Sequence, residues 1–306
     1  MKYSGIGGQA VIEGIMMMKG EDYAVAVRRP DKEIEVKKDT YQSITKKAKI
    51  LQLPFVRGVF RFADSMIIGM RSLTYSASFF EDDEDAEPGK FEQFLDRVFG
   101  EKLESAIMAA VLVISFILAI GIFMLLPLGI ANLFKGVITS DHLMAVLEGV
   151  IRIAIFIIYI KLVSRMEDIR RTFMYHGAEH KCINCVEHGH PLTVKYVRES
   201  SKEHKRCGTS FILIVMVISI LMFMVIRVDT IWMRILSRII LVPVIAGISY
   251  EVLQCAGRSN SKFMDLVSRP GMWMQGLTTK EPDDSMIEVA ITAMKEVIPD
   301  DGSDEW

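Results

Sequence analysis

Thirty consecutive residues without a charge, Ser105–Phe134 (SAIMAAVLVISFILAIGIFMLLPLGIANLF), decide the fold class of this 306-residue chain. A helix needs about 20 mostly apolar residues to cross a bilayer, so this run predicts a first membrane span. Pro127 and Gly129 near its end predict a bend or an early exit, which helices in lipid tolerate. Cys207–Ile226 adds twenty more uncharged residues and predicts another span of purely apolar character.

Two weaker runs, Leu143–Ser164 and Ile231–Tyr250, follow these spans after short connections, and each is long enough to cross. Glu148 and Arg152 stand four residues apart, so on a helix they share a face and can neutralise one another. We interpret them as an intrahelical pair, with a transport pathway as the alternative. The expected fold class is an α-helical polytopic membrane protein with about four transmembrane helices and a small N-terminal α+β cytoplasmic region.

The distribution of charge sets the expected orientation. The whole chain has 36 Lys and Arg against 38 Asp and Glu, which gives no reason to expect nucleic-acid binding. Nine basic residues fall between Arg165 and Arg206, whereas the connection Lys135–Asp141 has one. The positive-inside rule therefore places both termini and the central loop in the cytoplasm, in a multi-pass protein of the inner (plasma) membrane. The residues after Met1 contain no apolar core behind a basic start, so we expect no signal peptide.

Seven segments are expected along the chain. They are a strand-rich cytoplasmic region (1–50), an amphipathic interfacial helix (51–80), an acidic linker with a short helix (81–104), a first transmembrane hairpin (105–164), a His-rich cytoplasmic loop (165–206), a second hairpin (207–250) and a C-terminal cytoplasmic tail with short helices (251–306).

The N-terminal region predicts a small antiparallel meander and one long helix. Ala10–Met18, Tyr23–Arg28 and Glu33–Lys37 have strand-like patterns separated by turn residues. Pro54–Phe79 carries its charges on one arc of a helical wheel and its apolar residues on the other. Such a helix either lies in the membrane interface or packs on the meander, and the sequence leaves both possibilities open.

Chemistry is expected in the central loop, which holds five of the six histidines. His176 and His180 frame a His-x-x-Glu-His motif, in which two imidazoles one helical turn apart can bind one metal ion. Glu179 beside them can act as the general base on a metal-bound water. The alternative is that both histidines cap the preceding helix and form local hydrogen bonds.

The third ligand has two candidate sources. Glu251, expected at the cytoplasmic end of the fourth span, would give a His2Glu site with one open position, typical of zinc hydrolases. It needs a partner if it is buried after an uncharged stretch, and we favour it. His204 together with Cys207 would instead give a closed His3Cys site of structural type. Cys182 and Cys185 have the spacing of half a zinc ribbon, but no second pair completes it, so we regard them as incidental thiols.

Several blocks of the chain resemble those of the YqhQ-like bacterial membrane family. They are Gly7–Met17 (GGQAVIEGIMM), Arg57-Gly58, Phe173–Lys181 (FMYHGAEHK), Arg206–Phe211 (RCGTSF), Ala246–Glu251 (AGISYE) and Pro270–Pro282 (PGMWMQGLTTKEP). The family is catalogued as a domain of unknown function with the label of a predicted metal-dependent enzyme. The resemblance implies that the motif blocks include Gln9, Glu13, His176, Glu179, His180, Arg206, Cys207 and Glu251, whereas Cys182 and Cys185 fall outside them.

Two functional hypotheses follow. The first is a metal-dependent hydrolase, with zinc as the expected divalent metal and an unknown substrate, at the cytoplasmic face of the membrane. The second is a non-enzymatic membrane factor that helps to insert, assemble or transport a protein partner and holds at most a structural metal. The lipid bilayer is a partner in both.

Overall fold

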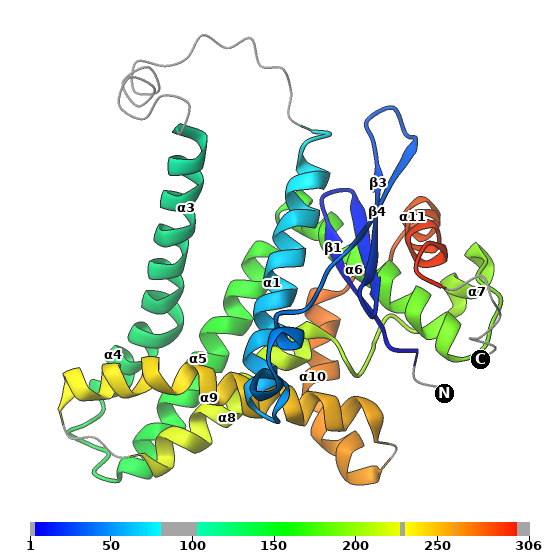
Figure 1. Ribbon diagram of the computed structural model, residues 1–306. Coiled ribbons are helices and arrows are strands. Elements are labelled where there is room, and N and C mark those ends of the chain that lie inside the picture. The colour runs from blue at the N-terminus through cyan, green and yellow to red at the C-terminus, as the bar shows by residue number, and fades with distance from the viewer. Residues whose placement is uncertain (1–3, 81–102, 227–229, 260, 299–306) are drawn as a thin grey trace. The chain divides into compact units, whose positions relative to one another are not determined.

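The structure, a computed structural model, describes residues 4–80, 103–226, 230–259 and 261–298 (Figure 1). Residues 81–102 of the expected acidic linker lie outside the described residues. The chain forms two compact units, one made of residues 81–159 and the other of residues 1–80 and 160–306.

The smaller unit consists of apolar helices. Its helices are α3 (Leu103–Ile120), a π-helical turn (Gly121–Leu125), α4 (Leu126–Asn132) and most of α5 (Asp141–Val163).

One buried polar contact joins these helices. Pro127 has no N–H to give to the carbonyl of Phe123 four residues before it. The Arg152 Nε atom of α5 donates to that oxygen at 3.0 Å and so satisfies it. The Arg152 guanidinium also contacts the Glu148 carboxylate at 2.6 Å. This confirms the intrahelical pair that the sequence predicted.

The larger unit contains a four-stranded antiparallel sheet in the order β1-β2-β3-β4. The strands are β1 (Ile6–Val11), β2 (Gly14–Lys19), β3 (Asp22–Arg28) and β4 (Ile34–Thr40). The sequence predicted one strand over Ala10–Met18, and that was wrong. Glu13 adopts φ 47° in a tight turn that separates β1 from β2, and the apolar residues on both sides of it conceal this turn in the sequence.

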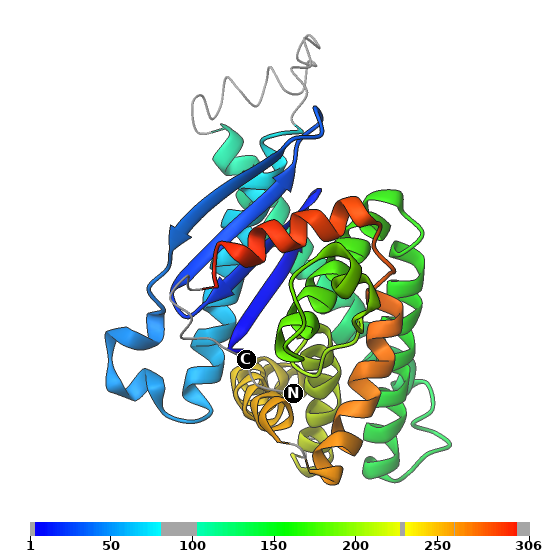
Figure 2. The same ribbon diagram turned by 90° about the vertical axis from the view of Figure 1, so that its right-hand side faces the viewer.

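Helices cover both faces of this sheet. On one face lie α6 (Glu167–Glu187) and α11 (Asp284–Lys295), with the short α7 (Val194–Glu199) beside them, and Figure 2 shows α11 lying across the strands. On the other face lies α1 (Val56–Ala77), which follows two 3-10 turns, η1 (Ile44–Lys47) and η2 (Lys49–Gln52). The main core fills the space between the sheet and α6 and α11. Helix α6, which carries the His-x-x-Glu-His motif, is therefore fixed along most of its length.

Three further helices complete the larger unit: α8 (Gly208–Val225), α9 (Ile231–Arg258) and α10 (Lys262–Thr278). Helix α8 packs against both α9 and α10. Helix α9 continues beyond Tyr250, the predicted end of the second hairpin, to Arg258.

Among the described residues, four helices are long and apolar enough to cross a membrane. Their spans are Ala110–Asn132, Asp141–Val163, Gly208–Val225 and Ile235–Gly257. The chain is therefore of the expected class, a helical multi-pass membrane protein with an N-terminal antiparallel sheet.

Candidate metal centre

His176 and His180 project from the same face of α6, one turn apart. Their ring centroids are 4.4 Å from each other, and the two planes are inclined at 65°. The predicted juxtaposition of the two imidazoles is present because the motif lies in the middle of a regular helix. Two nitrogen ligands for one ion are thus available from a single rigid element.

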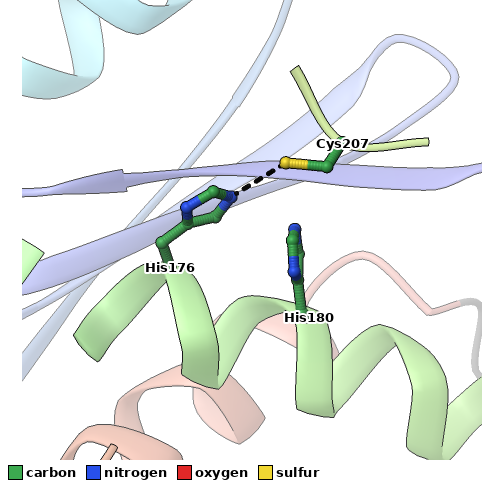
Figure 3. Close-up of side chains that lie close together, drawn as sticks. All are labelled: His176, His180 and Cys207. Carbon is green, nitrogen blue, oxygen red and sulfur yellow. Dashed lines mark hydrogen bonds between the residues drawn. The ribbon is translucent and has the colours of Figure 1, made fainter. Parts of the chain in front are cut away.

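Cys207 joins the two histidines from a distant part of the chain (Figure 3). It is the N-cap of α8, and its Sγ atom lies 3.2 Å from the Nε2 atom of His176. One ligand atom from each of His176, His180 and Cys207 lies within 4.8 Å of the others. Zinc holds such atoms at about 2.0–2.3 Å, which places neighbouring ligands about 3.5 Å apart, so modest side-chain movement brings all three to one ion.

Backbone carbonyls fix both rings in the orientation that a metal requires. The Nδ1 atom of His176 lies 3.0 Å from the Thr278 carbonyl oxygen, and that of His180 lies 2.7 Å from the Lys202 carbonyl oxygen. Because a carbonyl oxygen only accepts, each Nδ1 is the donor, and in the neutral ring this leaves the lone pair on Nε2. This arrangement is typical of metal-binding histidines. Two imidazoles and one thiolate form a donor set that suits zinc.

The segment that leads to Cys207 is held by buried side chains of α6. The Lys181 ammonium donates to the carbonyl oxygens of Arg198 and Ser200 at 2.8 and 3.0 Å. The Asn184 amide donates to those of Ser201 and Glu203 at 2.7 and 2.9 Å. Together with His180, these residues fasten five carbonyls of residues 198–203 to the helix that carries the histidines.

Gln275 of α10 secures the chain on both sides of Cys207. Its Nε2 atom donates to the His204 carbonyl at 2.7 Å and to the Ser210 hydroxyl at 2.8 Å, while its Oε1 atom accepts from the His204 N–H at 2.9 Å. The residue is fully buried. Gln275 lies inside one of the family-like sequence blocks, but its role could not be predicted, because no sequence pattern shows which backbone groups a lone glutamine contacts.

Gly177 lets the segment after α10 pass close to α6. A Cβ atom at this position would overlap the carbonyl oxygen of Lys280. The Thr278 carbonyl that orients His176 lies two residues before Lys280. The glycine between the two motif positions is therefore required by packing at the site itself.

Glu179 lies beside the two histidines but faces the sheet. Its side chain is buried against Gly8 of β1, whose N–H donates to the carboxylate. Burial raises the pKa of Glu179 to about 7, against the lowering effects of His176 and of the Gly8 hydrogen bond. A carboxylate with a pKa near neutrality can both accept and release a proton under physiological conditions.

The structure does not bring Glu251 to this group, so the expectation that it is the third ligand is corrected. Its carboxylate forms a two-point ion pair with the Arg57 guanidinium of α1, with N–O distances of 2.7 and 2.5 Å. It also accepts from the Phe55 N–H at 3.3 Å. The charge partner of the Glu251 carboxylate is thus an arginine 194 residues away in the sequence.

His204 also lies outside the ligand group, so the closed His3Cys set is not formed. Its ring centroid is 5.9 Å from that of His180, and its Nε2 atom contacts the Glu187 carboxylate at 3.3 Å. Burial lowers the pKa of His204, and the Glu187 hydrogen bond opposes this effect.

Glu187 is the centre of a second buried polar cluster. It accepts hydrogen bonds from the Ser4 N–H and hydroxyl at 3.1 and 2.7 Å, and it pairs with the Arg206 guanidinium. Burial favours its protonated form, but these contacts and the one from His204 outweigh burial and hold the pKa of Glu187 at about 2. The cluster anchors residues 204–206, immediately before Cys207.

The remaining residues singled out in the sequence have structural roles. Cys182 and Cys185 are buried in the main core, and burial raises the pKa of both thiols, which suits incidental rather than metal-binding cysteines. Glu13 pairs with Arg171 and accepts from the Tyr175 hydroxyl at 3.2 Å, so it fastens the β1–β2 turn to α6. The Gln9 amide donates to the Ser65 carbonyl of α1 at 3.3 Å.

Comparison with known sequences gives one family for this arrangement. The model of a family described as "Protein of unknown function (DUF1385)" matches residues 53–300. The chain belongs to the DUF1385 family. The matched DUF1385 region contains all three ligand candidates and Glu179. The chain is also similar to the "Uncharacterized protein YqhQ" of Bacillus subtilis (strain 168), with 34% identity over 95% of this chain and 92% of the relative. No solved structure matches the chain.

Proposed function

We propose that this protein is a metal-dependent hydrolase with its active site at the cytoplasmic surface of the membrane. The observation that carries the proposal is the convergence of three metal-binding atoms from two elements, with both imidazoles oriented through Nδ1. Three protein ligands are the usual number in catalytic zinc sites, which keep a fourth position for water or substrate.

Each residue has a separate task. His176, His180 and Cys207 would hold the metal, which would supply Lewis-acid chemistry at the site. Glu179, whose carboxylate interacts electrostatically with His176, would accept a proton from water and later return it to the leaving group. Lys181, Asn184 and Gln275 keep the Cys207 segment against α6.

The position of Cys207 supports a site at the membrane surface. Cys207 immediately precedes Gly208, the first residue of a candidate span. The nine basic residues between Arg165 and Arg206 favour the cytoplasmic side for this end of the span.

Metal analysis of the purified full-length protein tests the proposal. We expect one zinc per chain, which is lost in His176→Ala and His180→Ala. Glu179→Gln should retain the metal and yet fail to replace the wild-type gene in a cellular complementation assay, because it removes a base and no ligand. Full complementation by Glu179→Gln would refute the catalytic-base role even if zinc is bound.

A structural metal site in a non-enzymatic membrane factor for protein insertion, assembly or transport is the second candidate. Its support is burial, since the His180 and Cys207 residues are only 1% and 6% exposed, as is usual in closed sites. In that case all metal-free variants lose folding stability together with function, and Glu179→Gln behaves like the wild type.

A further inference from the structure

Helix α1 exposes a stripe of large apolar residues and buries several polar side chains. Phe62, Met66, Met70 and Leu73 are 44%, 49%, 41% and 41% exposed. The side chains that α1 buries include Asp64, Ser72 and Ser76, at 4%, 1% and 0% exposure. A surface helix in water shows the opposite arrangement, with the apolar stripe against the core and polar residues outside. The exposed apolar stripe of α1 therefore suits contact with an apolar environment.

Hydrogen bonds from the rest of the unit to Asp64 and Ser76 fix this orientation. The Asp64 carboxylate accepts from the hydroxyls of Tyr41 and Ser43 at 2.9 and 2.5 Å and from the Ile44 N–H at 3.0 Å. The Ser76 hydroxyl accepts from the Ile12 N–H at 3.2 Å. Rotation of α1 to bury its apolar stripe would break all of these bonds.

The outer face of α1 is continuous with a membrane span. The rings of Phe62 and Phe211, which lies in the first turn of α8, are 5.7 Å apart. Gly58 lies against Gly247 and Tyr250 of α9, so the two helices are in direct contact. Helix α9 runs across Figure 1 and is seen nearly end-on in Figure 2, whereas α1 crosses its direction. If α9 crosses the bilayer, α1 lies along the bilayer surface.

The residues before α1 extend this surface and add positive charge. Ile50, Leu53 and Phe55 are 64%, 52% and 55% exposed. Lys47 and Lys49 beside them are exposed too. Exposed apolar side chains next to lysines are typical of segments that bind anionic lipid surfaces.

We propose that residues 47–55 and the outer face of α1 are embedded in the cytoplasmic leaflet, with the apolar side chains among the acyl chains and the lysines at anionic headgroups. This inference does not depend on the metal centre, because none of these residues belongs to it. It makes the leaflet itself a binding partner of the N-terminal part of the chain.

Quenching of tryptophan fluorescence by brominated lipid tests the proposal in the full-length protein. The native tryptophans, Trp232, Trp273 and Trp306, are first changed to phenylalanine. Met66→Trp is then introduced, and the purified protein is reconstituted into vesicles. Bromine on the acyl chains should reduce the emission by about half or more, as expected for a side chain about 5–10 Å below the headgroups. Glu33→Trp, on the exposed turn before β4, is the control that should remain unquenched.

Met70→Trp provides an independent position on the same stripe if Met66→Trp does not elute as a single folded species. The proposal would be overturned if brominated lipid changes the emission at these positions no more than it does at residue 33. That result would mean that water, a second copy or another part of the chain covers α1. Brominated phosphatidylglycerol should quench more strongly than brominated phosphatidylcholine at equal fraction, and Lys47→Gln with Lys49→Gln should abolish the difference. Equal quenching by both lipids in the protein that keeps Lys47 and Lys49 would refute the preference for anionic lipid.

Discussion

Removal of the charge of Glu187 should make the larger unit less stable at neutral pH, and the loss should become smaller as the pH falls. The pKa of this buried carboxylate is about 2, against an ordinary value of 4.5. A difference of about 2.5 pKa units corresponds to about 3 kcal/mol of folding stability. Because the folded-state pKa is the lower one, this stability is complete above about pH 5 and is lost as the pH falls towards 2.

The assay is thermal unfolding of wild type and Glu187→Gln in detergent from pH 3 to pH 8, followed by tryptophan fluorescence. Metal is removed with a chelator beforehand, because ligand protonation would add its own pH dependence. For a unit of about 200 residues, 3 kcal/mol corresponds to a difference in Tm of about 6–12 °C at pH 7. The difference should shrink steadily below pH 4.5.

Glu203→Gln is the matched control, since Glu203 is an exposed carboxylate on the same segment. It should follow the wild-type curve throughout. A Glu187→Gln curve that runs parallel to that of the wild type from pH 3 to pH 8 would refute the reasoning, because the loss would then come from packing and not from the charge.

Three other predictions concern the metal centre and the membrane. Gly177→Ala should lower metal affinity at least about tenfold, because its Cβ atom would displace the segment that orients His176. Gly276→Ala is the control, since a Cβ atom there meets open space and the variant should bind metal normally. Equal affinities of the two variants in a competition titration would contradict this prediction. Cys207→Ser should lose tight zinc binding and Glu251→Ala should keep it, and the reverse result would restore the carboxylate ligand. Reporter fusions at residue 138 should be external and at the C-terminus cytoplasmic, so an external C-terminus would refute the even number of spans.

The membrane class could be predicted because thirty uncharged residues are a signal of composition alone. The two histidines could be predicted for a similar reason, since a helical period places positions four apart on one face. The β1–β2 hairpin could not, because its turn residue Glu13 is flanked by apolar residues that continue the strand pattern.

The ligand from outside the helix was harder to predict, because it depends on contacts between distant parts of the chain. Glu251 was a reasonable candidate while its surroundings were unknown, but Arg57 satisfies its charge. Cys207 was considered only together with His204, and the structure separates the two because Glu187 holds the His204 ring. Neither fact has a local signature in the sequence.

The dependence of His176 on the Thr278 carbonyl has a consequence for biosynthesis. The two residues are 102 positions apart, so the ring has no orienting partner when it leaves the ribosome. At about 5–20 residues per second, translation of the intervening chain takes about 5–20 seconds. During that time α8 and α9 are synthesised, and Cys207 also waits for Gln275. The nascent chain therefore passes through a period in which its imidazoles and thiol are present but not arranged, and the candidate metal site is complete only once α10 has been made.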